Sequence, residues 1–221
     1  DSPPVPLTRE VLALCAAAAL LVPPLAAQGI PWHPIVNIGD ERDEPARASQ
    51  LGGSATTGYL VRSASTLSPA LAGDSTRLRW ALLTPEVTAV SNSSIPFSLN
   101  DGAMWAGRGW NGRVRLGLRA EWGRFFLILA PELLASENRP YALADPATVP
   151  ARPQNRHPLS SPWHLDPSID APLRFGYEPY RQLVPGQSTF GARIGALAAG
   201  LSTENELWGP GIRNALVLSN N

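Results

Sequence analysis

The fold class of this chain is decided by the stretch RVRLGLRAEW, residues 113–122. Charged residues or glycine alternate there with apolar or aromatic residues over the whole stretch. This alternation predicts a β-strand with one polar face and one apolar face. The polar face carries Arg113, Arg115, Gly117, Arg119 and Glu121.

The neighbourhood of this strand predicts a hairpin in a membrane barrel. About ten residues span a membrane as a tilted strand, and Trp122 suits an interfacial aromatic girdle. Gly123 and Arg124 predict a tight turn into the apolar residues 125–130. A hairpin of a soluble sandwich is the alternative, but three arginines on one face favour a hydrated barrel interior. We therefore expect an all-β fold: an antiparallel transmembrane β-barrel, incomplete in this chain. The residues expected to face its lumen are Arg113, Arg115, Arg119 and Glu121.

The composition excludes several classes of protein. The 221 residues have zero formal net charge, so no positive surplus is available for nucleic acid. The single cysteine, Cys15, excludes an internal disulfide framework and a thiolate zinc cluster. The 23 prolines and 19 glycines leave little room for long helices. No zinc or calcium signature occurs, and we expect neither a metal nor a cofactor.

The N-terminus has the pattern of an export signal. Arg9 precedes twelve apolar residues, 11–22, which Pro23 and Pro24 follow, and small residues lie just before Gln28. The run suits the core of a signal peptide and is short for a membrane-spanning helix. A buried helix of a soluble domain is the alternative. We expect residues 1–27 to be a signal peptide.

Two further regions are expected after the signal peptide. Residues 28–75 are polar and broken, with weak helical periodicity near their end, which predicts a solvated segment with a short helix. Residues 76–221 are expected to hold the first barrel strands. Within them, the proline-rich residues 137–188 predict a long loop or plug, and the alternating residues 190–198 predict one further strand.

Three motifs could carry chemistry, and each has a simpler interpretation. The stretch GRGWNG, residues 107–112, matches GxGxxG, but a strand follows it where dinucleotide binding needs a helix. A glycine-rich turn is the better interpretation. The histidines His33, His157 and His164 lack a rigid metal-ligand spacing. Paired carboxylates could hydrolyse a glycosidic bond, and the candidates are Asp166, Asp170, Glu204 and Glu206.

Seven tryptophans are an enrichment that suggests sugar binding. Aromatic faces stack on sugar rings, whereas Trp80 and Trp122 fit an aromatic girdle or packing role. Four of the remaining tryptophans are candidates for contact with sugar, because they lie beside glycine, asparagine or acidic residues: Trp105, Trp110, Trp163 and Trp208.

The end of the chain carries a family resemblance. Residues 200–211, GLSTENELWGPG, and residues 216–221, LVLSNN, resemble the Wzi family of capsule-assembly outer-membrane proteins. Residues 100–109, NDGAMWAGRG, and 169–176, IDAPLRFG, are similar to that family as well. The resemblance implies a monomeric outer-membrane barrel with a small periplasmic helical part and a plugged lumen. It also implies a lectin-like role, and this chain would cover the front half of such a protein.

We therefore expect a non-enzymatic protein in the outer membrane of a Gram-negative-type bacterium. Its partners would be surface or capsular polysaccharide and outer-membrane lipid, with no nucleic acid. A porin-like channel is the first alternative, and a secreted glycan hydrolase using Glu204 or Asp170 is the second. The candidate polysaccharide-binding residues are Trp105, Arg108, Trp110, Trp163, Asp170, Arg174, Glu204, Asn205 and Trp208.

Overall fold

The computed structural model describes the strands of the chain and the segments that connect them. The described residues are 32–36, 38, 61–98, 101–141, 178–195 and 197–208, with Ala13, Ala16, Asp43, Pro45 and Ala48. All of the expected signal peptide except Ala13 and Ala16, and most of the expected loop or plug, therefore lie outside the described residues.

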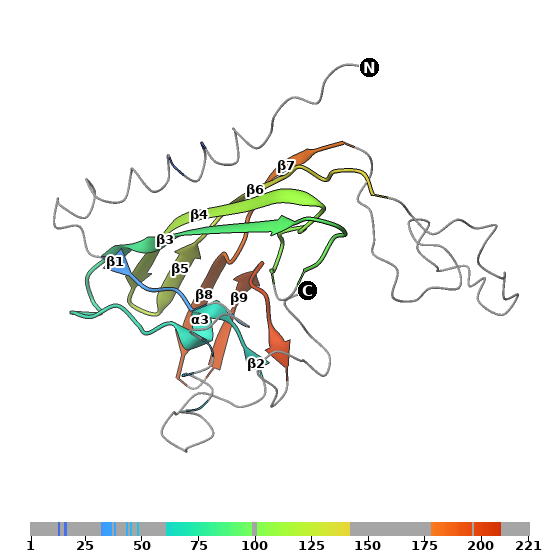
Figure 1. Ribbon diagram of the computed structural model, residues 1–221. Helices are drawn as coiled ribbons and strands as arrows, with labels where there is room; N and C mark the ends of the chain where they lie inside the picture. Colours follow the sequence, from blue (N-terminus) through green and yellow to red (C-terminus); the bar gives the residue numbers. More distant parts are fainter. Residues whose placement is uncertain are drawn as a thin grey trace, which may run out of the picture.

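The described part of the chain is nearly all β, as predicted (Figure 1). Its elements are β1 (Trp32–His33), β2 (Val61–Arg62), α3 (Ala64–Leu67), β3 (Arg79–Asn92), β4 (Gly109–Trp122), β5 (Phe125–Leu129), β6 (Glu132–Ser136), β7 (Tyr180–Val184), β8 (Thr189–Ile194), β9 (Leu197–Ser202) and β10 (Leu207–Trp208).

Eight of the strands form one open sheet, and β2 and β10 form a small second one. The path through the large sheet is β1-β3-β4-β5-β8-β9, with β6 beside β4 and β7 beside β6. All pairs are antiparallel except β1 with β3. Because β5 and β6 pair with successive halves of β4, they act as two halves of one strand. In the same way, β8 and β7 follow β5 and β6. The sheet is thus a meander with open edges.

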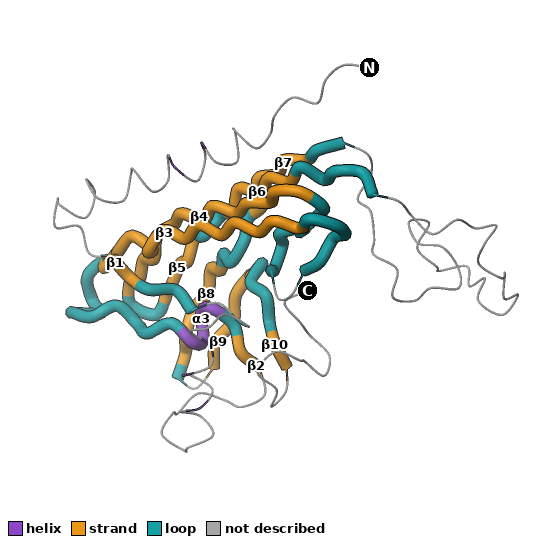
Figure 2. Tube along the Cα trace, in the orientation of Figure 1, coloured by secondary structure: helices purple, strands orange, loops and turns teal. Residues whose placement is uncertain are grey.

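Prolines interrupt the meander at one level of the sheet. Pro131 separates β5 from β6, Pro185 separates β7 from β8, and Pro85 coincides with a register shift in β3. Proline cannot donate to a strand ladder, and such irregularities let a sheet bend. Gly186, at φ +59°, completes the break, since a Cβ there would lie 2.3 Å from the carbonyl oxygen of Ala130. Figure 2 shows the sheet curving around α3.

The two faces of this curved sheet have the reverse of the usual polarity. The inner face is lined by charged side chains that are buried, such as Arg115 and Arg119. The outer face carries exposed apolar side chains from every long strand. They include Trp80, Val87, Leu116, Trp122, Phe125, Leu129, Leu183, Phe190, Ile194, Leu197 and Leu201. The alternation predicted for residues 113–122 is confirmed by the alternating faces of β4.

A small apolar core lies between the inner face and the N-terminal part of the chain. Its members are Ile35, Ala64, Leu83, Ile128 and Ala130. The weak helical periodicity before residue 68 corresponds to α3, a single turn with a capping box between Ser63 and Thr66. Among the described residues, no helix is long and apolar enough to cross a membrane.

Two tight turns connect strands at one end of the sheet. The predicted turn at Gly123 is confirmed, because Trp122 pairs with Phe125 and Gly123 has φ +57°. The prediction of one strand over residues 190–198 is wrong. Ile194 pairs with Leu197 across a two-residue turn that begins at Gly195, φ +61°, so both side chains lie on the outer face. Gly195 fitted the alternation, and only its backbone conformation reveals the reversal.

Candidate functional site

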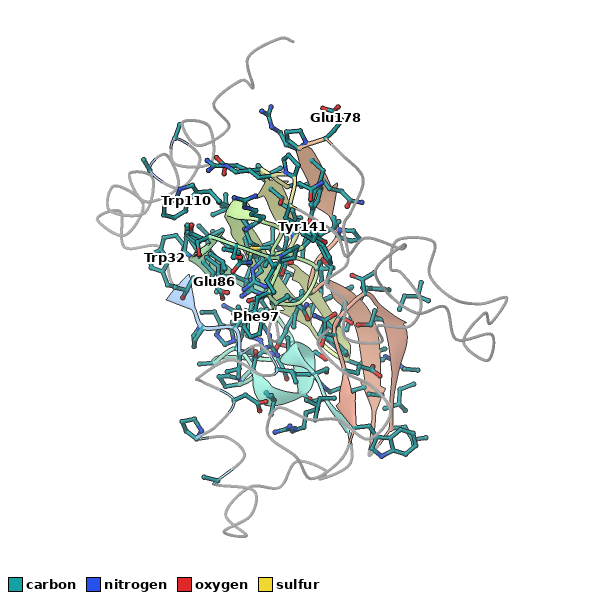
Figure 3. The ribbon with its side chains drawn as sticks, turned by 45° about the vertical axis from the view of Figure 1, so that its right-hand side comes forward. Trp32, Glu86, Phe97, Trp110, Tyr141 and Glu178 are labelled. Atoms are coloured by element: carbon teal, nitrogen blue, oxygen red, sulfur yellow. The ribbon has the colours of Figure 1, made fainter. Side chains whose placement is uncertain are left out.

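The inner face of the sheet carries two clusters of ion pairs. The first, the Glu86 cluster, consists of Glu86, Arg113, Arg115 and Glu132. The Glu86 carboxylate accepts a hydrogen bond from Nη2 of Arg113 at 2.9 Å and another from Arg115. Arg115 also donates from Nη1 to Glu132 at 3.3 Å. Figure 3 shows Glu86 among the side chains that gather on the sheet.

The second, the Glu121 cluster, lies nearer the tight turns and consists of Arg79, Arg119 and Glu121. The Glu121 carboxylate accepts Nε of Arg119 at 2.8 Å and Nη2 of Arg79 at 2.9 Å. His33 of β1 lies beside it, with Nε2 3.5 Å from Nη1 of Arg119. The four expected lumen-facing residues thus lie on one face and belong to these two clusters.

Such clusters are expensive in the interior of a soluble protein. Removing each charge from water costs several kcal/mol, which the partner's attraction offsets only with good geometry. Here four arginines and three glutamates share the inner face, whereas the outer face exposes leucine, tryptophan and phenylalanine. A soluble sheet would place these two sets of side chains the other way round.

Segments of the same chain cover both ends of the inner face. Near the tight turns, the Ser68 carbonyl accepts Nη1 of Arg119 at 3.4 Å, and the Leu71 amide donates to Glu121 at 3.4 Å. At the other end, Arg113 donates to the Asp101 carbonyl at 3.0 Å. These segments satisfy polar groups of the clusters that would otherwise face water.

The prediction of a glycine-rich turn at GRGWNG is wrong, because residues 109–112 begin β4 and Arg108 forms a bridge with Asn92. This stretch lies at the end of the sheet opposite the tight turns. Asn111 of β4 donates from Nδ2 to the carbonyl oxygens of Gly107 and Gly109, at 2.8 and 3.0 Å. Gly109 has φ +98°, and a Cβ there would lie 2.3 Å from a carboxylate oxygen of Glu137. The glycines of GRGWNG therefore serve the backbone of a loop closure.

Three of the sugar-contact candidates lie at this loop end. Arg108 donates from Nε to the Ser93 carbonyl at 3.2 Å and from Nη1 to that of Pro140 at 2.6 Å. The Trp105 amide donates to the Tyr180 hydroxyl at 2.9 Å. Trp110 lies on the outer face of β4, in view in Figure 3. We call this end of the sheet the loop rim. It comprises the loop of residues 93–108 between β3 and β4, which contains Trp105 and Arg108, and the adjoining Trp110.

Three other candidates lie beside α3, away from the loop rim. The Glu204 carboxylate is buried and accepts the Ser65 amide of α3 at 2.7 Å. The Asn205 amide donates to the side-chain oxygen of Gln187 at 2.9 Å, and Trp208 forms part of β10. The remaining candidates lie outside the described residues: Trp163, Asp170 and Arg174, together with Asp166, His157 and His164.

Sequence reasoning missed the glutamates that complete the clusters. Glu132 follows Pro131 and shares the inner face of β6 with Leu134 and Ser136. The two-residue period of β6 could therefore have predicted that Glu132 lies on this face. Glu86 directly follows the register shift at Pro85, which obscured its face.

In the turn before β3, hydrogen bonds from the amide and hydroxyl of Thr76 hold the pKa of exposed Asp74 below its ordinary value.

Within the described residues, no group of three or more His, Cys, Asp or Glu side chains could hold a metal ion. Comparisons of the chain with family models, curated proteins and solved structures give no match. The proposals below therefore depend on the geometry of the sheet and on the sequence.

Proposed function

We propose that this chain forms part of the wall of an outer-membrane β-barrel that binds surface or capsular polysaccharide without catalysing a reaction. The reversed polarity of the curved sheet is the observation that carries the proposal. A wall with apolar residues outside and polar residues inside suits lipid on one side and water or a plug on the other. Further strands would close the open edges of the sheet.

The outer face has the dimensions that a bilayer needs. Trp110 and Trp122 lie twelve residues apart on the same face of β4. At about 3.3 Å per residue and a tilt of about 40°, this separation spans roughly 30 Å of membrane. Trp80 pairs with Ala120 and Phe125 with Trp122, so they extend the row of aromatic residues at the tight-turn end. Two aromatic rows flanking an apolar band are typical of outer-membrane barrels.

The lengths of the connections favour one orientation in the membrane. The connections of β4 to β5 and of β8 to β9 are two residues long, whereas residues 93–108 and 137–179 form long connections at the other end. Outer-membrane barrels have short periplasmic turns and longer extracellular loops. The loop rim would therefore lie at the cell exterior, with Trp110 at the membrane interface and with Trp105 and Arg108 beside the surface polysaccharide.

Binding of the glycan itself would use the chemistry of the loop rim. Indole faces stack on sugar rings, and guanidinium groups donate to hydroxyl or carboxylate oxygens. The similarity of residues 200–211 to the Wzi family supports a role in capsule assembly or attachment. The chain segments that cover both ends of the inner face favour a plugged barrel over a porin-like channel.

A binding assay tests this function. The complete protein, purified in detergent, is titrated with polysaccharide extracted from the surface of its own host, and tryptophan fluorescence is followed. We expect Trp105→Ala to weaken binding at least tenfold, whereas Trp122→Ala, at the opposite membrane interface, leaves it unchanged. Absence of binding by the unaltered protein would refute the lectin-like role.

The porin-like alternative draws on the arginines of the inner face and is tested separately. In planar bilayers, a large open conductance of the unaltered protein, reduced by Arg115→Ala, would favour a channel. A protein that shows no open conductance and binds polysaccharide would favour the proposed function.

A further inference from the structure

After β9 the chain leaves the wall and crosses to the inner side of the sheet. Thr203 is still tied to the wall, since its amide donates to the Ser188 carbonyl and its hydroxyl to that of Gly186, both at 2.8 Å. The Asn205 amide continues this attachment through Gln187. All three partners lie in the proline bend between β7 and β8. Residues 203–208 are called the strap below.

The other side of the strap holds the N-terminal part of the chain. Glu204 accepts the Ser65 amide in the first turn of α3, where helix amides lack partners of their own. Three residues after Glu204, Leu207 and Trp208 pair with Arg62 and Val61 to form the small sheet of β10 and β2. Leu207 is fully buried. Residues 61–73, which the strap holds, are called the inner segment below.

The inner segment has polar attachments to both the wall and the strap, and one of those to the wall is a charge-assisted hydrogen bond from Arg79 of β3 to the Leu71 carbonyl. Its bonds to Arg119 and Glu121, through Ser68 and Leu71, are both 3.4 Å long, whereas the bond from Ser65 to Glu204 is 2.7 Å and charge-assisted. Ala64 adds apolar contact with the wall through the small core. The strap therefore holds the start of the inner segment, residues 61–65, whereas Arg79 and Arg119 of the Glu121 cluster hold its later residues.

We propose that the strap is a latch that holds the inner segment closed over the periplasmic end of the barrel, with Glu204 as its positioning residue. This inference rests on the proposed function, because it takes the inner face to be the wall of a lumen. Glu204 then acts through α3, and neither binds sugar nor hydrolyses it. Loss of its carboxylate would release the start of the inner segment, residues 61–65, and open a path along the charged inner face.

Two variants of the strap separate this role from a general loss of stability. Glu204→Ala removes the acceptor of the Ser65 amide. Glu206→Ala, in the same strap, removes an exposed carboxylate and is the matched control. Val61→Cys with Trp208→Cys joins paired Cα positions, which antiparallel pairing places within disulfide range. Cys15, the single cysteine of this chain, lies in the expected signal peptide, which would be removed on export.

The experiment measures amide hydrogen exchange and planar-bilayer conductance of the complete protein. For Glu204→Ala we expect exchange of the inner segment to rise about tenfold to a hundredfold, the effect of a lost charge-assisted hydrogen bond, while exchange in β4 stays unchanged. Conductance should rise with it. The oxidised cysteine pair should suppress both effects, and a reductant should restore them.

Two outcomes would overturn the latch. One is wild-type exchange and conductance in Glu204→Ala, and the other is an equal effect of Glu206→Ala. Failure of the proposed function has a different signature: polysaccharide binding is absent from the unaltered protein, while the exchange pattern of the strap, measured in detergent, is unaffected.

Discussion

Leu116 offers the sharpest test of the outer face, because it lies midway between Trp110 and Trp122 on β4 and its side chain is 46% exposed. Six residues separate it from each tryptophan, which corresponds to about 15 Å of depth on either side at a tilt of about 40°. Leu116→Arg would therefore place a cation at the middle of the bilayer. We expect it to lower the free energy of unfolding by about 2–4 kcal/mol.

A matched substitution near the membrane interface separates the effect of depth in the bilayer from the effect of introducing an arginine. Leu78 precedes β3 at the tight-turn end and is 67% exposed, so Leu78→Arg lies near the membrane interface. We expect a cost of about 0–1 kcal/mol there. In a soluble protein both arginines would point into water, and each would change stability by about 0.5 kcal/mol or less.

The assay is reversible urea unfolding of the complete protein from phospholipid vesicles, followed by tryptophan fluorescence. The unaltered protein and both variants are measured in the same lipid, and the difference between the variants is the decisive quantity. Equal, small effects of Leu116→Arg and Leu78→Arg would refute a lipid-facing outer face, and the barrel proposal would fall with it.

Three further substitutions test the inner side and the packing of the sheet. Glu86→Ala leaves Arg115 with one carboxylate partner, and urea unfolding should show a loss of about 3 kcal/mol. Gly117→Ala would place a Cβ 2.2 Å from the Leu129 carbonyl oxygen and should cost about 1–3 kcal/mol in the same assay. Asn111→Ala removes the bonds that close the loop rim and should speed limited proteolysis within residues 93–108, with unchanged cleavage as the contrary result.

The local period of the sequence predicted which residues lie on each face of the sheet. It could not predict which carboxylates pair with the arginines of the polar face. Alternation assigned Arg113, Arg115 and Arg119 to one polar face, and β4 has them there. The carboxylates that pair with Arg113 and Arg115 come from β3 and β6, between 17 and 29 residues away along the chain, whereas Arg119 pairs with Glu121 of its own strand. Pairs between strands depend on strand register, which a single strand does not encode.

The predicted strand across residues 190–198 failed for a related physical reason. A two-residue turn shifts the alternation by one position, so Ile194 and Leu197 share a face. The small residues around the turn hide this shift in the sequence, because they fit either a strand or a turn. Only the positive φ of Gly195 and the pairing of Ile194 with Leu197 distinguish the two. The candidate sugar residues were likewise chosen by type, and the structure divides the described ones between the loop rim and α3.

The pairing within the clusters also bears on what the lumen of the proposed barrel could do. A selective channel needs guanidinium groups that can exchange water for passing anions. In the Glu86 cluster, one carboxylate bridges Arg113 and Arg115, and Arg113 is bonded in addition to the covering loop through Asp101. An anion would have to displace these internal partners, which are already in place. This arrangement favours a wall that holds a plug, with recognition left to the loop rim outside.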